Sequence, residues 1–488
     1  MDFSPFYHRE QQLTDLNKML DRDGPAFVIV YGRRRVGKTW LIQYWAQRSG
    51  LPTFYWVATR TTPENLRSEL VSALWSWQSP DREVESAPRY DHWRDVFRAI
   101  RRIAGDQPMV IILDEFPWAV DSDPSLPSQL QAAWDSIFLD SRVKLIISGS
   151  HIATMESLLA SDAPLFGRLT GKLYVPPFEF HEIADFIPNY PPDKQLAAYA
   201  VVGGVPDYLR HWSDRADLME NIREIFLSEN SPFRNESDIL ISDVLRRDSP
   251  HYLAVLSAVA KGHRELADLS SAAVLEKDRA SVVLSTLINL RLIEKRIRAS
   301  TPLDQHETAR YARYFLADPF LRFFFYMVVP HRTHIAQQNY APILRDFTEQ
   351  MRSFVGAAFE DLCRSWTINM MRAGKLPFAP DFVGSDWRGD TQIDVMAVNW
   401  REGRVLAGEA KWTEADVDLG VHTKLIDHTQ LALAYMPIGK SWWVQHVLFS
   451  RNDFTPPCRQ AAKAAGTQLL TFEEIVDDLR TIRGPVIR

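Results

Sequence analysis

The sequence of 488 residues predicts a multidomain α/β protein whose first domain is a parallel five-stranded sheet. Short apolar runs begin near residues 27, 53, 109, 143 and 172 and alternate with helical segments, which is the rhythm of β-α-β units. Residues 110–113 are all apolar, as in a strand buried on both faces. A glycine-containing stretch, residues 32–39, lies directly between the first apolar run and a helical segment.

The composition is that of a globular chain, with 46% hydrophobic and 24% charged residues and a net charge of -6. Its length suggests roughly three or four domains. Two cysteines, Cys363 and Cys458, are too few for a disulfide framework or a thiolate zinc site. No apolar run reaches the roughly 20 residues of a membrane span, and the N-terminal residues lack a signal-peptide core. We therefore expect a cytoplasmic protein without a membrane partner.

Residues 32–39 have the spacing of a phosphate-binding loop. The stretch reads Gly32, Arg33, Arg34, Arg35, Val36, Gly37, Lys38 and Thr39. In such a loop the glycines allow a tight turn and close backbone approach, the lysine reaches the terminal phosphates, and the hydroxyl binds Mg²⁺. Backbone N–H groups at the start of the next helix add positive potential. The chemistry leaves the three arginines unassigned: they contact phosphate, a neighbouring subunit or a lid.

Two carboxylates end the strand at 109–115. The carboxyl ends of parallel strands face the ligand crevice of an open α/β sheet, so Asp114 and Glu115 are expected at the nucleotide. Asp114 suits a direct or water-mediated hold on Mg²⁺, which prefers oxygen ligands. Glu115 suits polarisation of the attacking water, the alternative being a solvated acid at a loop start.

The next strand, residues 143–150, ends in small polar residues at the same edge. Ser148 or Ser150 either hydrogen-bonds the γ-phosphate or the water, or belongs to a plain turn. Arg168 follows and is a candidate arginine finger, in cis or in the site of a neighbouring copy. A surface arginine is the alternative, and action in trans would imply a homo-oligomer.

The middle of the chain changes to helical patterns. Residues 178–240 read as helices broken at Gly203–Pro206, which predicts a helical lid. Residues 251–298 read as helix, short helix, helix and strand, which is the winged-helix order. The third helix offers few basic side chains, Lys277, Arg279 and Arg291. Two alternatives therefore stay open for this domain: it contacts DNA, or it has a structural role alone.

The C-terminal third carries a second set of chemical groups. A helical segment contains Glu360, a strand of alternating pattern contains Asp394, and a second strand contains Glu409 and Lys411. An acid on one strand and Glu-x-Lys on the next bring two carboxylates and an ammonium to one end of a hairpin. That set predicts binding of one or two Mg²⁺ and in-line attack on a phosphodiester, with Lys411 stabilising the developing charge.

These motifs together resemble the archaeal-type ATPases of the STAND branch of P-loop proteins, relatives of AAA+ ATPases and origin-recognition proteins. The resemblance rests on Phe6-x-x-Arg9-Glu10, YGRRRVGKT at 31–39, ILDEF at 112–116, SGS at 148–150, LFGR at 165–168, GGVPDYL at 203–209 and ADPFLRFFF at 317–325. It implies ATP hydrolysis, a winged-helix domain and, frequently, a nuclease-like C-terminal domain. Gly204 to Pro206 is similar to the branch's GxP element, which places the lid against the nucleotide.

The C-terminal motif resembles the PD-(D/E)xK nuclease core, with Glu360 as the helical acid. Many relatives carry Glu-Ile-Asp where this chain has Gln392, Ile393 and Asp394, so a supporting carboxylate is missing and metal affinity is expected to fall.

We expect four domains: a P-loop ATPase core at 1–177, the lid at 178–240, the winged helix at 241–330 and the restriction-endonuclease-like α/β domain at 345–488. The leading hypothesis is a protein that binds and hydrolyses ATP with Mg²⁺ and whose nucleotide state controls a metal-dependent DNA nuclease. The alternatives are a nucleotide-gated switch or scaffold that binds DNA or protein through an inactive nuclease-like domain, and a stand-alone ATPase acting on protein.

Overall fold

The computed structural model describes residues 8–79, 87–231, 233, 236, 249–307, 309, 311–436 and 441–482. Phe6 of the N-terminal motif, most of 232–240 in the predicted lid and the start of the predicted winged helix lie outside the described residues. The chain divides into two compact units. One runs to Pro177 and includes Val205–Asp207; the other holds Phe178–Gly204 and the chain from Tyr208 onward.

The first unit contains the predicted five-stranded parallel sheet. Its strands are β1 (Ala26–Tyr31), β2 (Thr53–Val57), β3 (Met109–Asp114), β4 (Val143–Gly149) and β5 (Gly171–Tyr174). Their order is β2-β3-β4-β1-β5, and each neighbouring pair is parallel. Every residue of β1, β3 and β4 is buried, as expected of central strands covered on both faces. The predicted sheet is confirmed.

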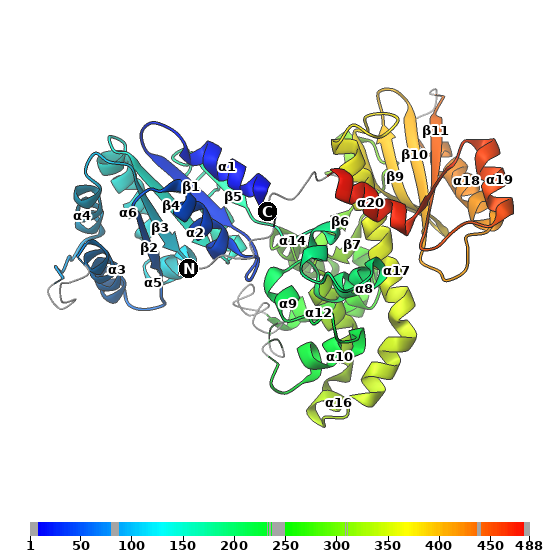
Figure 1. Cartoon of the computed structure of the whole chain (residues 1–488), viewed down its shortest axis with the longest axis horizontal. Helices are drawn as coiled ribbons and strands as arrows, with labels where there is room; N and C mark the ends of the chain where they lie inside the picture. The colour runs from blue at the N-terminus through cyan, green and yellow to red at the C-terminus, as the bar shows by residue number, and fades with distance from the viewer. Residues whose placement is uncertain are drawn as a thin grey trace. The chain divides into compact units, whose positions relative to one another are not determined.

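Helices cover both faces of this sheet (Figure 1). On one face, Leu16 of α1 and Leu41 of α2 pack against Val28. On the other, Phe27 lies 5.0 Å from Trp134, measured between ring centroids. The helices of the unit are α1 (Glu10–Leu20), α2 (Lys38–Ser49), α3 (Pro63–Gln78), α4 (Trp93–Ala104), α5 (Phe116–Ser122), α6 (Leu126–Ala133) and α7 (Ile152–Ser157).

The second unit begins with helices and a two-stranded sheet. The helices are α8 (Pro192–Val202), α9 (Pro206–Arg210), which starts in the first unit, α10 (Leu218–Ile222), α12 (Ser249–Ala260), α13 (Leu266–Ala272), α14 (Lys277–Asn289), α15 (Pro319–Phe323) and α16 (Arg332–Ala336). Strand β6 (Ile293–Arg296) pairs antiparallel with β7 (Arg313–Leu316), a strand that the sequence did not predict. Gly203 ends α8 with φ of +67°, so the predicted helix break is present.

The chain ends in a separate mixed sheet of order β12-β11-β10-β9-β8. Its elements are α17 (Ala341–Arg372), β8 (Phe382–Arg388), β9 (Thr391–Asn399), β10 (Arg404–Lys411), α18 (Leu419–Ala434), β11 (Trp443–Ser450), α19 (Pro456–Ala465), β12 (Gln468–Thr471) and α20 (Phe472–Ile482). The predicted hairpin is the antiparallel pair β9–β10. The predicted helical segment that contains Glu360 is part of a 32-residue helix, because buried apolar residues continue along it in both directions.

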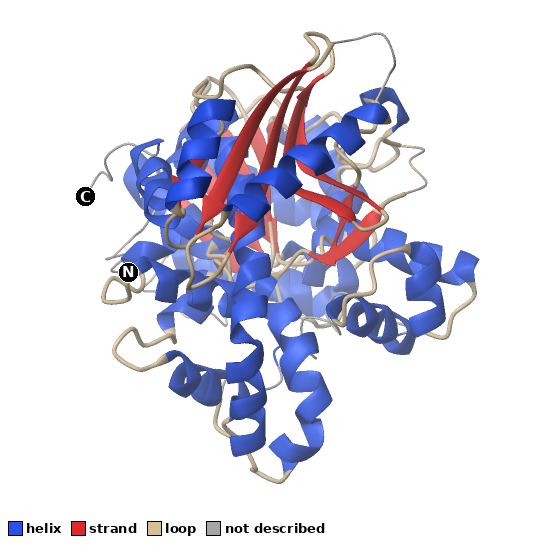
Figure 2. Cartoon of the chain, turned by 90° about the vertical axis from the view of Figure 1, so that its right-hand side faces the viewer, coloured by secondary structure: helices blue, strands red, loops and turns tan. Residues whose placement is uncertain are grey.

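Helices pack across the strands of the C-terminal sheet (Figure 2). Trp366 of α17 lies 5.6 Å from Phe449 of β11, measured between ring centroids. Leu425 of α18 and Cys458 of α19 belong to another cluster, with Val405 of β10. Within the described part of the chain, no helix is long and apolar enough to span a bilayer.

Candidate nucleotide site and carboxylate cluster

The loop from β1 to α2 adopts a conformation that its two glycines permit. A Cβ on Gly32 would lie 2.3 Å from the carbonyl oxygen of Val175, so any side chain there would collide with backbone. Gly37 has φ of +90° and caps α2, a conformation that costs glycine little. The loop backbone therefore leads directly into the N-terminus of α2, where free N–H groups favour an anion.

Lys38 is buried at the start of α2 and reaches across to β4. Its Nζ donates to the carbonyl oxygen of Arg33 at 3.0 Å and to Ser150 Oγ at 2.9 Å. Burial lowers the pKa of Lys38 to about 8, although the carboxylates of Glu115 and Asp114 oppose this and the exposed Arg34 adds to it. The ammonium group of Lys38 is thus shielded from solvent.

Asp114 lies at the centre of a group of hydroxyls. Its Oδ2 accepts from Thr39 Oγ1 at 2.7 Å and from Tyr55 OH at 2.9 Å, and its Oδ1 accepts from Ser148. The structure thus brings together the two residues predicted to hold Mg²⁺, Thr39 and Asp114. Tyr55 was not predicted, because it lies on the neighbouring strand with no motif around it. Its pKa is raised by burial and then by Asp114.

Glu115 faces the same edge of the sheet. It has φ of +50°, which turns the chain away from the end of β3. Its Oε1 accepts from Ser150 Oγ at 2.7 Å, and its Oε2 accepts from Ser150 N at 3.3 Å. Ser150 therefore links Lys38 to Glu115, so the predicted lysine, serine and acid form one hydrogen-bonded chain.

The arginines of the loop have separate surroundings. Arg35, with φ of +68°, forms an ion pair with Asp207, next to the predicted Pro206 and within the same unit. Arg9 Nη2 donates to the carbonyl oxygen of buried Val36 at 3.1 Å. Of the open alternatives for Arg35, contact with the GVPD segment is therefore the one present in the chain.

Arg168 pairs with Asp135, outside the hydrogen-bond network of Lys38, Asp114 and Glu115. Its guanidinium forms a fork with Asp135, with Nε at 3.0 Å from both carboxylate oxygens and Nη2 at 2.8 Å from Oδ2. The hydrogen bond to Asp135 raises the pKa of Arg168. A finger role would require this fork to open, and it stays a prediction.

The C-terminal acids meet at the β9–β10 hairpin. Asp394 Oδ2 accepts from the N–H of Ala410 at 3.0 Å, and its Oδ1 accepts from Gln392 Nε2 at 2.9 Å. Lys411 Nζ lies 2.5 Å from Glu409 Oε1. Gln392, identified above as a departure from the resemblance, thus holds Asp394 directly.

Glu360 interacts electrostatically with this hairpin. The pKa of Glu360 is raised to about 8, chiefly by burial. The negative charge of Asp394 contributes to this rise, and that of Glu409 contributes a smaller amount. The positive charges of Arg364 and Lys411 oppose the rise. Burial and Asp394 also raise the pKa of Glu409. Burial alone would lower the pKa of Lys411, but the adjacent Glu409 reverses the direction.

These groups do not form a ready metal cage. Among the residues that the structure describes, no group of three or more His, Cys, Asp and Glu side chains is arranged to hold a metal ion. The acids of the hairpin are instead balanced by an ammonium and an amide. The metal-ligand role of Glu360, Asp394 and Glu409 stays a prediction.

The parallel sheet and its loop define the class of the first unit: it is a P-loop domain of the ATPase type. Residues 6–211 match the family model described as an ATPase domain predominantly from Archaea. Residues 324–443 match a second model, described as archaeal and bacterial proteins of unknown function.

The chain is also similar to individual proteins. An uncharacterized protein of Methanocaldococcus jannaschii is 26% identical over 465 residues, covering 92% of this chain and 100% of that protein. A Walker-type ATPase of Pyrococcus abyssi is 20% identical with a TM-score of 0.48, covering 66% of this chain and 96% of that one. The Aeropyrum pernix ORC2 protein, solved with ADPNP and ADP, is 16% identical with a TM-score of 0.43, covering 70% and 98%.

Proposed function

We propose that the first unit binds ATP with Mg²⁺ and hydrolyses it. The observation that carries this proposal is the paired network at the carboxyl edge of the sheet. Lys38 and Glu115 share Ser150 Oγ, and Asp114 accepts from the Thr39 hydroxyl. A single edge thus offers a cation for phosphate, oxygen ligands for Mg²⁺ and an acid for the water.

Each group has a distinct role in this proposal. Lys38 binds the β- and γ-phosphates, while Thr39 and Asp114 hold Mg²⁺, which neutralises phosphate charge when bound. Glu115 orients the water that attacks the γ-phosphorus, and Ser150 positions Glu115. The loop from Gly32 to Gly37 supplies backbone N–H groups.

Paired variants test these roles. Lys38→Ala should weaken ATP binding strongly, whereas Glu115→Gln should leave ATP binding nearly unchanged and reduce steady-state phosphate release at least hundredfold. Glu69→Gln, an exposed acid on α3, is the matched control. Full turnover in Glu115→Gln would remove Glu115 from the mechanism, and unchanged binding in Lys38→Ala would remove the site.

A second candidate function belongs to the C-terminal sheet: metal-dependent cleavage of DNA phosphodiesters. It is favoured by the meeting of Asp394, Glu409 and Lys411 on one hairpin and by the rise that Asp394 causes in the pKa of Glu360. The order α17-β8-β9-β10-α18-β11 also matches the α-β-β-β-α-β order of the nuclease core.

The chemistry of the hairpin residues fits this candidate. The three acids offer only oxygen donors, which suit Mg²⁺, and a bound Mg²⁺ would generate hydroxide and polarise the phosphate. Glu360, Asp394 and Glu409 would hold the ion. Lys411 stabilises charge that develops on the phosphate, and the N–H of Ala410 and Gln392 keep Asp394 oriented.

Cleavage of plasmid and linear DNA in Mg²⁺ or Mn²⁺ tests the second candidate. Asp394→Ala and Lys411→Ala should each lower the cleavage rate at least hundredfold, because groups of such sites act as a unit. Lys424→Ala, which removes an exposed lysine on α18, should cleave normally. Equal cleavage by all variants, or none by the wild type, would favour the inactive switch or scaffold.

Control of the nuclease by nucleotide is a further part of the proposal. Cleavage measured with and without ATP, in the wild type and in Lys38→Ala, should respond to ATP only in the wild type. A cleavage rate that does not change with ATP in either protein would contradict the coupling.

DNA is the partner proposed for the second unit. Three helices, α12 to α14, followed by the β6–β7 hairpin have the winged-helix order, which supports binding of duplex DNA. Arg279 and Arg291 lie on and just after α14. Their replacement by Gln should weaken binding and reduce the slope of affinity against salt by about one per lost phosphate contact. An unchanged slope would favour a structural wing.

A further inference from the structure

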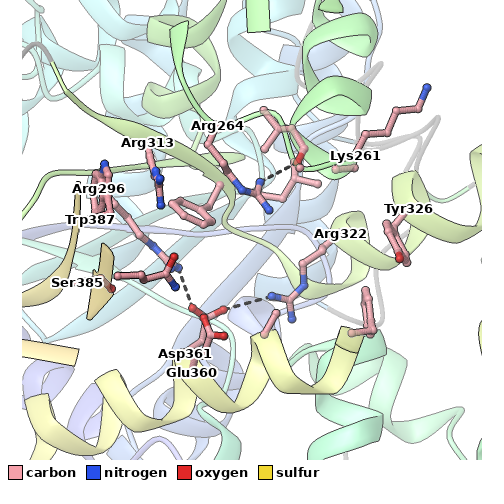
Figure 3. Close-up of a pocket in the computed structure, with 18 of the residues that line it drawn as sticks. Lys261, Arg264, Arg296, Arg313, Arg322, Tyr326, Glu360, Asp361, Ser385 and Trp387 are labelled. Atoms are coloured by element: carbon pink, nitrogen blue, oxygen red, sulfur yellow. Dashed lines mark hydrogen bonds and ion pairs between the residues drawn. The ribbon is translucent and has the colours of Figure 1, made fainter. Parts of the chain in front are cut away.

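A cavity of about 730 Å³ lies inside the second unit (Figure 3). It is bounded by the end of α12, the β6–β7 hairpin, α17 and the first strands of the C-terminal sheet. Its size falls within the usual range of small-ligand sites, roughly 300–1,000 Å³. The cavity therefore has room for a ligand the size of a nucleotide.

Cations outnumber acids in its lining. The cationic lining residues are Lys261, Arg264, Arg296, Arg313, Arg322 and Arg364. The acidic lining residues are Glu265, Asp268, Glu360 and Asp361. The lining thus carries six cationic side chains against four acidic ones.

The carboxylate of Asp361 forms ion pairs with three guanidinium groups. Figure 3 shows Asp361, on helix α17, between Arg296 and Arg322. Its Oδ1 lies 2.9 Å from Arg296 Nη2 and its Oδ2 lies 3.2 Å from Arg322 Nη1, and it also pairs with Arg364. Arg296 also pairs with Glu294, at 2.7 Å between Nη2 and Oε2, so two carboxylates face three partly buried cations.

Burial and the excess of positive charge lower the pKa of several arginines, and some of their N–H donors have no hydrogen-bond partner among the described residues. Burial lowers the pKa of Arg264, Arg322 and Arg364 to about 10, and in each case Arg296 is the next cause. In the described part of the chain, Nε of Arg313 and Nε of Arg322 are buried without a hydrogen-bond partner. Buried, unbalanced donors of this kind destabilise a fold unless an anion meets them.

Aromatic rings hold the guanidinium planes in place. Arg264 and Arg296 lie over the ring of Phe315, at 4.5 and 4.1 Å from its centroid. Arg313 lies 4.9 Å from the ring centre of Trp387. A guanidinium fixed by its face keeps its N–H edge available, and that edge matches the oxygens of a phosphate in a two-point fork.

We propose that this cavity is a binding site for a phosphate ester of nucleotide size, held by Arg264, Arg313 and Arg322. The phosphate takes the buried Nε donors of Arg313 and Arg322 and adds negative charge beside Arg264, whose Nη1 donates to the carbonyl oxygen of Val259. The site is distinct from the loop at residues 32–39, and it shares Glu360 and Gln392 with the hairpin site. Both a free small nucleotide and the phosphate of a nucleic-acid strand offer this chemistry.

Arg313 is the residue to replace, because no carboxylate among the described residues hydrogen-bonds it, and Glu265 interacts with it only electrostatically. The full chain carrying Lys38→Ala, which disables the other nucleotide site, is titrated calorimetrically in EDTA with three probes. The probes are inorganic phosphate, the 5′-phosphorylated thymidine dinucleotide and a longer oligothymidylate. Lys295→Gln is the matched control, since Lys295 precedes Arg296 on β6 and points to the opposite face.

Arg313→Gln should bind the dinucleotide at least tenfold more weakly than Lys295→Gln, because a charged hydrogen bond is lost. Arg264→Gln should do the same and substitutes for Arg313→Gln if that variant melts early. Equal affinity for the dinucleotide and the longer strand would identify a small nucleotide, and tighter binding with a steeper salt slope would identify a strand. Equal binding by the arginine and lysine variants, or no binding of any probe at about 1 mM, would overturn the proposal.

Discussion

Replacing Glu360 by Gln should make the protein more stable in alkaline buffer and leave it almost unchanged in acid. Glu360 is partly buried on α17, and its pKa is raised from 4.5 to about 8 by burial and then by Asp394. Glutamine keeps the size of the side chain and removes its charge. The comparison therefore isolates the cost of ionising a carboxyl at this position.

The sign follows from proton linkage. The folded state holds the Glu360 proton more tightly than the unfolded state does. The stabilisation is therefore complete below about pH 4.5 and is lost as the pH rises through about 8. A difference of about 3.5 pH units corresponds to at most about 5 kcal/mol in the free energy of unfolding, at 1.36 kcal/mol per unit. Because part of the rise comes from neighbouring charges that salt screens, we expect about 2–5 kcal/mol at pH 9.

Thermal unfolding in EDTA at pH 5, 7 and 9 measures this difference. At about 2 °C of melting temperature per kcal/mol for a unit of this size, Glu360→Gln should melt about 4–10 °C above the wild type at pH 9. Glu349→Gln, an exposed acid on the same helix, should show no such trend. A melting difference that stays constant from pH 5 to pH 9 would refute the raised pKa and the coupling with it.

Three further outcomes test other parts of the fold. A double-mutant cycle of Arg35→Ala and Asp207→Ala should give a coupling of about 0.5–1 kcal/mol in ATP affinity or unfolding, because the pair is only partly exposed. Cys363 should resist thiol reagents in the native protein and react once it is unfolded in urea, since burial raises its pKa well above the usual value. Gly408→Ala should lower the free energy of unfolding by about 1–3 kcal/mol, because a Cβ there would lie 2.8 Å from the Phe449 ring; a denaturant titration measures it.

The parts of the fold that the sequence predicted well are those with local causes. A run of apolar residues makes a buried strand, and a glycine at each end of the loop fixes its turns, so the parallel sheet and the position of Lys38 followed from residues close together in the chain. The meeting of Asp114 with Thr39 followed from a general property of parallel sheets, whose carboxyl ends share one edge.

The parts that were missed depend on contacts between distant residues. A lid contact was one alternative for Arg35, but its partner Asp207 could not be named, because it lies 172 positions away. Tyr55 contacts Asp114 only because β2 and β3 are neighbours in the sheet, and strand order is not written in the periodicity of either strand. The arginine cavity gathers residues from 259 to 392, and each of its arginines reads in the sequence as an ordinary surface charge.

Glu360 and Asp361 are adjacent on α17 and both line the cavity, but the pKa of Glu360 also responds to the hairpin. Asp361 binds the arginines of the cavity, while the pKa of Glu360 responds to Asp394, Glu409 and Lys411 of the hairpin as well as to Arg364. Phosphate in the cavity would add negative charge near Glu360 and raise its pKa further, whereas a cation at the hairpin would lower it. The two candidate sites are therefore expected to shift the titration of one carboxyl in opposite directions. The pH dependence of melting with phosphate alone and with Mg²⁺ alone separates them in the same protein.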